Sequence, residues 1–136
     1  AGESRAVDAN PGIEDSGGGG DEVFDEARYR QNIGEVDLMG ELIGFFEEDS
    51  GEMMREVEAA FEAGEAEQVH RAAHRLKGLI GNFAAPRAFE RATALDTHAR
   101  EGDLAQARPL LDPLKKDLDD LTVVLARFRS NLEENE

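Results

Sequence analysis

The sequence predicts an all-α fold, an antiparallel four-helix bundle with one or two additional short N-terminal helices. Apolar residues recur at steps of three and four along most of the chain, and no segment alternates with the period of a β-strand. Short turn-forming stretches separate helical segments of similar length, which favours antiparallel neighbours. The 136 residues, 40% of them hydrophobic, suffice for one modest core.

The N-terminal stretch 1–21 is expected to lie outside this fold. It contains a run of four glycines and mixed charges without any helical or strand period, which is typical of a flexible linker or a cloning remnant. The chain does not begin with methionine, so we expect processing or excision from a longer chain. We assign 22–136 to the helical domain.

The first helical elements are set by apolar spacing and by glycines. A short helix is expected from Phe24 to Asn32, with Gly34 ending it. A second helix is expected from Glu35 to Glu48, and its apolar residues between Leu38 and Phe46 form a face broad enough to contact both the core and a partner.

A break is expected after this second helix. Asp49, Ser50 and Gly51 interrupt the apolar pattern, and Ser50 is a suitable N-cap for a separate helix. That helix would run to Ala63 and stop at Gly64.

The next helix begins near Glu65 and carries a buried stripe at steps of four and three. The stripe consists of Val69, Ala73, Leu76, Ile80 and Phe83. Pro86 then suits the first turn of a following helix, whose stripe contains Ala88, Ala92, Leu95 and Ala99 and which ends at Gly102.

The last segment keeps the spacing of three and four from Leu104 to Leu132, and Asp103 is expected to cap its start. Pro109 and Pro113 interrupt it. Either both prolines lie on the solvent side of one bent helix, or Asp112 and Pro113 begin a new helix after a short one.

A second face of the Val69–Phe83 helix concentrates the polar chemistry. At about 100° per residue, Arg71, Lys77, Gly78 and Gly81 fall within roughly 60° of His74. Each internal glycine costs about 1 kcal/mol relative to alanine, so the loss of side chains here indicates that a partner approaches closely. A neutral imidazole is a nucleophile suited to a phosphoryl group, and the Lys77 ammonium would offset phosphate charge.

The charge distribution supports the same region. The net charge is −16, which disfavours binding to nucleic acid or to an anionic membrane. The segment 69–91 contains five basic residues and one acidic residue, and its net charge of +4 leaves −20 for the rest of the chain. No cysteine is present and no apolar run has the length of a membrane span, so we expect no membrane insertion and a cytoplasmic location.

The hexapeptide Ala73-His74-Arg75-Leu76-Lys77-Gly78 resembles the AHxLKG signature of histidine-containing phosphotransfer (HPt) domains, the helical modules of multistep two-component phosphorelays. The likeness extends from about Val23 to Phe128. It includes the sequence FFEED, the pair Leu95-Asp96 and the sequence REGD at 100–103.

The resemblance implies in-line transfer of a phosphoryl group between Nε2 of His74 and an aspartate of a response-regulator receiver domain, with Lys77 neutralising charge and Gly78 giving access. It implies a phosphocarrier rather than an enzyme, because the receiver supplies Mg²⁺ and most catalytic groups; no cofactor is expected on this chain. A hybrid sensor histidine kinase is a second expected partner. The residues expected to contact the receiver are Arg71, Arg75, Leu79 and Gly81.

One position differs from a subgroup of the family and indicates which subgroup the chain resembles. In the modules joined to chemotaxis kinases, an acidic residue of the neighbouring helix supports the histidine, whereas Thr93 occupies the expected place here, which favours a relay module.

Two other functions stay open. A silent adaptor would bind receivers without carrying phosphate. A metal-binding bundle would use His70 and His74, but the sequence shows no further ligands for such a site, and we expect no metal. We expect a monomer; the broad face from Leu38 to Phe46 is the one feature that favours an oligomer.

Overall fold

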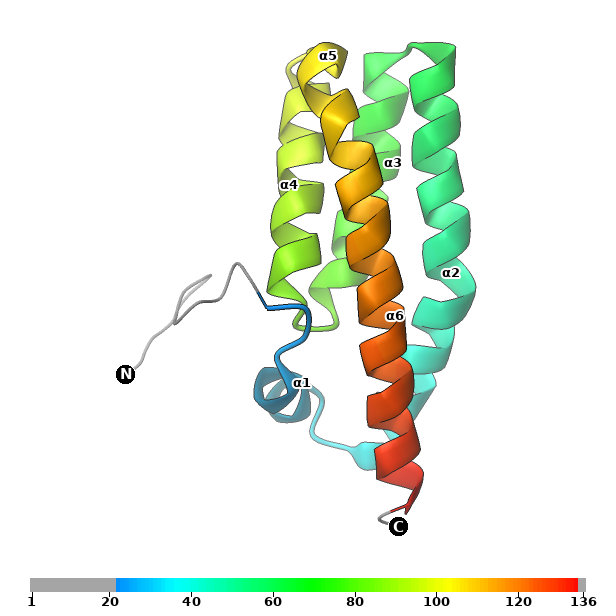
Figure 1. Cartoon of the computed structure of the whole chain (residues 1–136), viewed down its shortest axis with the longest axis vertical. Helices are drawn as coiled ribbons and strands as arrows, with labels where there is room; N and C mark the ends of the chain where they lie inside the picture. Colours follow the sequence, from blue (N-terminus) through cyan, green and yellow to red (C-terminus); the bar gives the residue numbers. More distant parts are fainter. Residues whose placement is uncertain (1–21, 135–136) are drawn as a thin grey trace, which may run out of the picture.

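The computed structural model describes residues 22–134, and this part of the chain forms the predicted antiparallel four-helix bundle. Its long helices are α2 (Val36–Ala63), α3 (Ala66–Gly81), α4 (Pro86–Arg100) and α6 (Leu111–Glu134). Successive long helices run in opposite directions (Figure 1), and both α3 and α6 pack between α2 and α4. The linker predicted for 1–21 lies outside the described residues.

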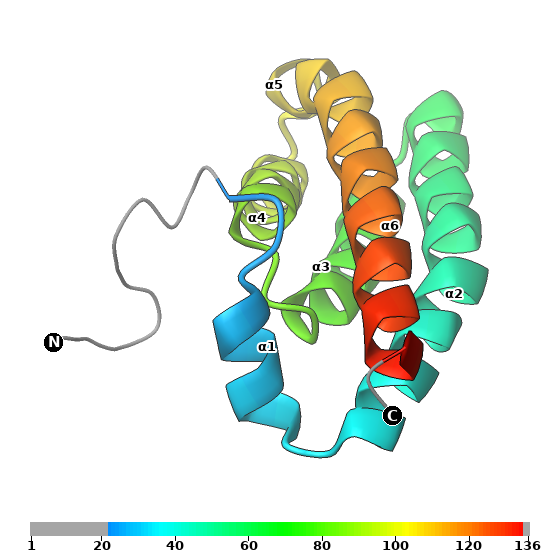
Figure 2. The same cartoon turned by 60° about the horizontal axis from the view of Figure 1, so that its bottom comes forward.

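The N-terminal helix α1 (Glu26–Ile33) closes one end of the bundle, beside the point where α3 ends (Figure 2). The Asp25 carboxylate caps it by accepting a hydrogen bond from the Arg28 amide at 3.1 Å, and Gly34 ends it in the left-handed conformation, with φ of 82°. The Tyr29 side chain anchors it, because its hydroxyl donates to the Met39 carbonyl at 2.9 Å while its ring stacks on Phe83. This is the short N-terminal helix that the sequence predicted.

The predicted break at Ser50 is wrong, because α2 continues without interruption from Val36 to Ala63. Ser50 is buried, and the residues one turn to either side, Phe46 and Met54, belong to the core. Ser50 therefore occupies a core position of the α2 stripe. Burial of that stripe against the rest of the bundle outweighs the low helix propensity of aspartate, serine and glycine. Gly64 ends the helix as predicted, with φ of 71°.

The turn between α3 and α4 contains an alanine in a conformation that favours glycine. Ala84 has φ of 50°, a backbone conformation that costs a residue with a Cβ about 1–2 kcal/mol. Its methyl group is buried, and its carbonyl accepts a hydrogen bond from the Asp25 amide at 2.7 Å, which ties the start of α1 to this turn. Pro86 follows in the first turn of α4, as predicted.

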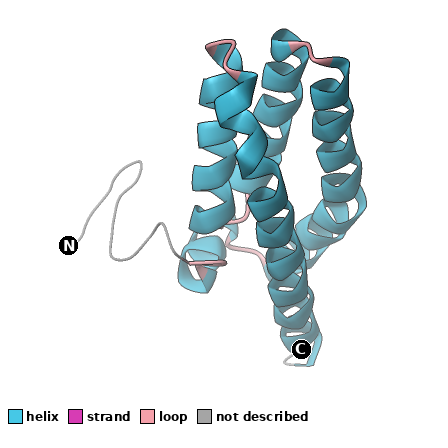
Figure 3. Cartoon of the chain, turned by 45° about the horizontal axis from the view of Figure 1, so that its top comes forward, coloured by secondary structure: helices cyan, strands magenta, loops and turns pink. Residues whose placement is uncertain are grey.

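The C-terminal segment combines the two predicted alternatives. The helix α5 (Leu104–Ala107) is capped by Asp103, as expected, and passes through the 3₁₀ turn η2 (Arg108–Leu110) directly into α6. The path is thus helical throughout, as Figure 3 shows, but α-helical hydrogen bonding changes around Pro109, which has no amide hydrogen to donate. The new α-helix begins at Leu111, one residue before the predicted cap Asp112.

Candidate functional site

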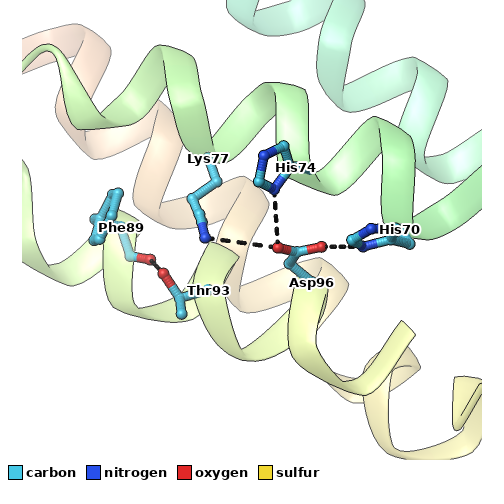
Figure 4. Close-up of polar contacts among 6 residues, drawn as sticks. All are labelled: His70, His74, Lys77, Phe89, Thr93 and Asp96. Atoms are coloured by element: carbon cyan, nitrogen blue, oxygen red, sulfur yellow. Dashed lines mark hydrogen bonds and ion pairs between the residues drawn. The ribbon is translucent and has the colours of Figure 1, made fainter. Parts of the chain in front are cut away.

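The predicted stripe of α3 faces the core, and this orientation leaves His74 at the surface. Each stripe residue is at most 1% exposed, whereas the His74 side chain is 64% exposed. The histidine that the sequence singled out is therefore accessible from solvent, on the side of α3 next to α4 (Figure 4).

A buried carboxylate from α4 lies behind His74. Asp96 is only 3% exposed, and its Oδ2 atom lies 3.2 Å from Nδ1 of His74. The second oxygen, Oδ1, lies 2.5 Å from Nδ1 of His70, and Nζ of Lys77 is 3.6 Å from Oδ2. The carboxylate thus joins three side chains of α3 to α4 (Figure 4).

The ionisation of Asp96 determines how the two imidazoles are protonated. Burial acts to raise the pKa of Asp96, but hydrogen bonds from His74 and His70 and the charges of His70 and Lys77 outweigh it and hold that pKa below its usual value. Asp96 is therefore a carboxylate near neutral pH and can only accept hydrogen bonds. Each histidine must present an N–H at Nδ1, so a neutral His74 has its lone pair on Nε2.

The sequence prediction that Thr93 stands where a supporting acid would be is wrong. The Thr93 hydroxyl instead donates to the Phe89 carbonyl of its own helix, at 2.7 Å. The supporting acid is Asp96, which removes the argument against a chemotaxis-type module. The sequence of α4 contained a signal for this role. Asp96 is four residues after Ala92 and three before Ala99, so its carboxylate lies on the buried face of α4, the helix that packs beside the His74 helix.

The two glycines of the His74 face have different surroundings. Among residues 22–134, no neighbouring atom lies within 4 Å of a Cβ added to Gly78, so this position is open to an approaching molecule. A Cβ added to Gly81 would lie 3.3 Å from the ring of Phe89, so Gly81 permits close packing of α3 on α4. Phe89 is itself 40% exposed and adds apolar surface beside the site (Figure 4).

The basic residues of the 69–91 segment are each paired with an acid from outside it. Arg71 and Arg75 pair with Glu67 and Glu56 at 2.7 and 2.8 Å. The remaining pairs are Lys77 with Asp96, Arg87 with Asp120 and Arg91 with Asp117. Folding thus compensates locally much of the positive charge that the sequence concentrates there. Leu79 is half-buried and packs against the core.

Residues 22–134 offer no support for a metal-binding or membrane-spanning function. Within this part of the chain, no three His, Asp or Glu side chains are grouped so that they could hold a metal ion. None of its helices combines the length and apolar composition of a membrane span.

Comparisons with known proteins agree with this geometry. The family model described as "Hpt domain" matches residues 41–123, which include His74 and Asp96. Among solved structures, the chain is similar to histidine-containing phosphotransfer protein B (HptB) from Pseudomonas aeruginosa PAO1, with 26% sequence identity and a TM-score of 0.69 over 77% of this chain and 90% of that one. No curated protein sequence matches the chain.

Proposed function

The chain belongs to the Hpt domain family, and from this premise we propose that His74 is its phospho-acceptor, which takes a phosphoryl group from a receiver-domain aspartate and passes it to another receiver. The family assigns the chain a role in histidine phosphotransfer within phosphorelays and interaction with receiver domains, as a phosphocarrier module. The observation that carries the assignment to His74 is the exposed imidazole whose Nδ1 is held by a buried carboxylate.

The proposed step is an in-line displacement at phosphorus. The bond from Nε2 of His74 to phosphorus forms while the bond from phosphorus to the aspartyl oxygen of the receiver breaks, and that aspartate leaves as a carboxylate. The imidazole becomes positively charged as it gives up its lone pair. Asp96 stabilises that charge through the Nδ1 hydrogen bond, and it orients the ring before the reaction.

Lys77 and Gly78 have separate roles in this proposal. The Lys77 ammonium lies beside Asp96 and can turn toward the phosphoryl oxygens, whose negative charge it would offset. Gly78 leaves the space through which the acyl phosphate reaches Nε2. The receiver supplies Mg²⁺ and the other catalytic groups, and this chain supplies an oriented nucleophile.

The surface around His74 is suited to docking of a receiver. Exposed apolar area from Phe89 lies against Gly81 of α3, and Gly78, Arg71 and Arg75 belong to the same helix. Exposed ion pairs are worth only about 0–1 kcal/mol, so both arginines can exchange Glu67 and Glu56 for acidic groups of a partner at little cost. We further propose that a hybrid sensor histidine kinase is a second partner and that this chain is cytoplasmic and monomeric.

The test is transfer from a receiver that carries radiolabelled phosphate on its aspartate. We expect the chain to acquire label that is labile in acid and stable in alkali, and we expect His74→Gln to acquire none. His98→Gln is the matched control, because His98 lies on α4 and pairs with Glu101 rather than with Asp96. Measurable binding of receivers without any label on the wild-type chain would favour the adaptor function instead.

A further inference from the structure

The second imidazole at the site, His70, is not explained by phosphate acceptance on His74. It lies one turn earlier on α3, and its side chain is 30% exposed, about half as accessible as His74. Its Nδ1 contacts the Asp96 oxygen that His74 does not use. One carboxylate therefore receives two imidazole N–H groups, one on each oxygen.

This arrangement restricts the rotation of the carboxylate. The terminal torsion of an aspartate is broad, so a single hydrogen bond leaves its plane poorly defined. With Oδ1 held by His70, Oδ2 stays directed at Nδ1 of His74 and toward Lys77. Without His70, the buried Oδ1 would lack that donor, and rotation toward another donor such as Lys77 would take Oδ2 away from His74.

We propose that His70 is a positioning residue: its Nδ1–H fixes Oδ1 of Asp96, so that Oδ2 holds the proton of His74 on Nδ1 and keeps Nε2 unprotonated for phosphoryl transfer. This inference rests on the proposed function of His74. It adds a chain of two hydrogen bonds that connects His70 to His74 through Asp96 and joins α3 to α4 (Figure 4).

The surroundings of His70 distinguish this role from that of a second phospho-acceptor. The residue four positions after His74 is Gly78, which leaves open space. The residue four positions after His70 is His74 itself, with the two ring centroids 5.9 Å apart. His74 thus fills the side from which an acyl phosphate would approach His70, so a supporting role suits His70 better.

Two variants separate the hydrogen bond of His70 from its bulk. His70→Phe keeps a ring of similar size but has no N–H, whereas His70→Asn loses the ring and keeps an amide donor near the position of Nδ1. Nitrogen NMR of the imidazoles reports the fraction of neutral His74 that carries its proton on Nδ1. We expect that fraction to be high in the wild type, to fall in His70→Phe and to recover in His70→Asn.

The rate of transfer from a phosphorylated receiver is the second readout. We expect it to fall about tenfold in His70→Phe, because a misplaced nucleophile reacts more slowly, and to return most of the way to the wild-type rate in His70→Asn. His98→Phe, on the same helix as Asp96 but outside this chain of hydrogen bonds, should leave both the His74 tautomer and the rate unchanged. If His70→Phe does not fold by circular dichroism, His70→Ala replaces it.

The outcomes are separable from those of the proposed function. An unchanged His74 tautomer in His70→Phe would overturn the positioning role even if His74 carries phosphate. A shifted His74 tautomer in His70→Phe would support the positioning role of His70 even if the wild-type chain accepts no phosphate. The proposed function would then fail while the positioning role stands. Label on His70 in the His74→Gln variant would overturn the positioning role in favour of a second acceptor.

Discussion

At the scale of single residues, the site depends on one buried carboxylate. Asp96 stays ionised because its oxygens receive hydrogen bonds from two imidazoles and face an ammonium, and this outweighs the effect of burial on its pKa. The same contacts select the Nδ1–H tautomer of His74. A buried carboxylate thus controls the protonation of an exposed imidazole ring.

We expect Asp96→Asn to lower the free energy of unfolding near pH 7 by about 1–3 kcal/mol, because the amide group replaces one acceptor with a donor that faces other donors. The folded-state pKa of Asp96 lies below the unfolded value of 3.8. Its stabilising contribution is therefore complete above that value and is lost as the pH falls through the folded-state pKa.

Urea denaturation at neutral and acidic pH tests this prediction. The difference in unfolding free energy between wild type and Asp96→Asn should shrink as the pH falls below that unfolded value. Asp49→Asn, at an exposed position on α2, should change stability by less than about 0.5 kcal/mol. If the difference in unfolding free energy stays constant down to the pH at which the wild type unfolds, the charge of the Asp96 carboxylate does not contribute to stability.

At the scale of elements, α3 gives up helix stability at Gly78, four residues after His74. Packing within the described part of the chain does not require glycine at position 78, since a Cβ there would meet none of its neighbouring atoms within 4 Å. The proposed function accounts for the glycine by the space that it would leave for a receiver domain.

We expect Gly78→Ala to raise the free energy of unfolding by about 0.5–1 kcal/mol, as for any exposed glycine inside a helix. Gly78→Leu should keep the helix content but abolish phosphoryl transfer from a receiver, because its side chain fills the approach to Nε2. Gly51→Ala on α2 is the matched control: it should stabilise by a similar amount, since its Cβ makes only ordinary contact with Arg55, and should leave transfer unchanged. Normal transfer by Gly78→Leu would contradict the access argument.

The helix α1 is attached to the bundle chiefly through Tyr29, whose burial raises the pKa of its hydroxyl to about 12. We expect Tyr29→Phe to lower the free energy of unfolding near pH 7 by about 1 kcal/mol, because the hydrogen bond to the Met39 carbonyl is lost.

The folded-state pKa of Tyr29 exceeds the unfolded value of 10.0, so its contribution is present below pH 10.0 and is lost as the pH rises through about 12. Denaturation curves at rising alkaline pH should therefore show wild type losing stability relative to Tyr29→Phe. If the two proteins lose stability in parallel, Tyr29 ionises in the folded state without cost.

At the scale of the whole molecule, folding pairs charges that the sequence keeps apart. The basic segment 69–91 lies in an acidic chain, and its cations meet acids from α2, α4 and α6 as well as from their own helix. The pair of Arg91 and Asp117 is partly buried: Nε of Arg91 donates to Oδ2 of Asp117 at 2.8 Å, and the Asp117 side chain is only 5% exposed. It joins α4 to α6.

We expect Arg91→Met to destabilise the bundle by about 1–3 kcal/mol, because it leaves the Asp117 charge buried without its partner, although Arg91 itself is partly solvated. The double variant Arg91→Met with Asp117→Leu should recover most of this loss, since it removes both charges. Thermal denaturation of the two variants provides the comparison. A double variant as unstable as the single one would indicate that Arg91 stabilises the bundle by packing of its side chain rather than by its charge.

Sequence alone determined those features whose causes are local. Helix ends at Gly34 and Gly64, the proline at the start of α4 and the cap at Asp103 depend on residues within one turn, and they are where they were predicted. The four-helix architecture and the exposure of His74 also follow from residue spacing, because a stripe that faces the core fixes which residues face water.

Tertiary structure decided what depends on the rotation of one helix against another. Whether Ser50 breaks α2 depends on packing from neighbouring helices. Asp96 meets His74 and His70 across 22 and 26 residues of sequence, and spacing within α3 contains no information about which side chain of α4 lies opposite. The exposed histidine could therefore be found from the sequence, whereas the carboxylate that contacts it was identified only when the two helices were packed together.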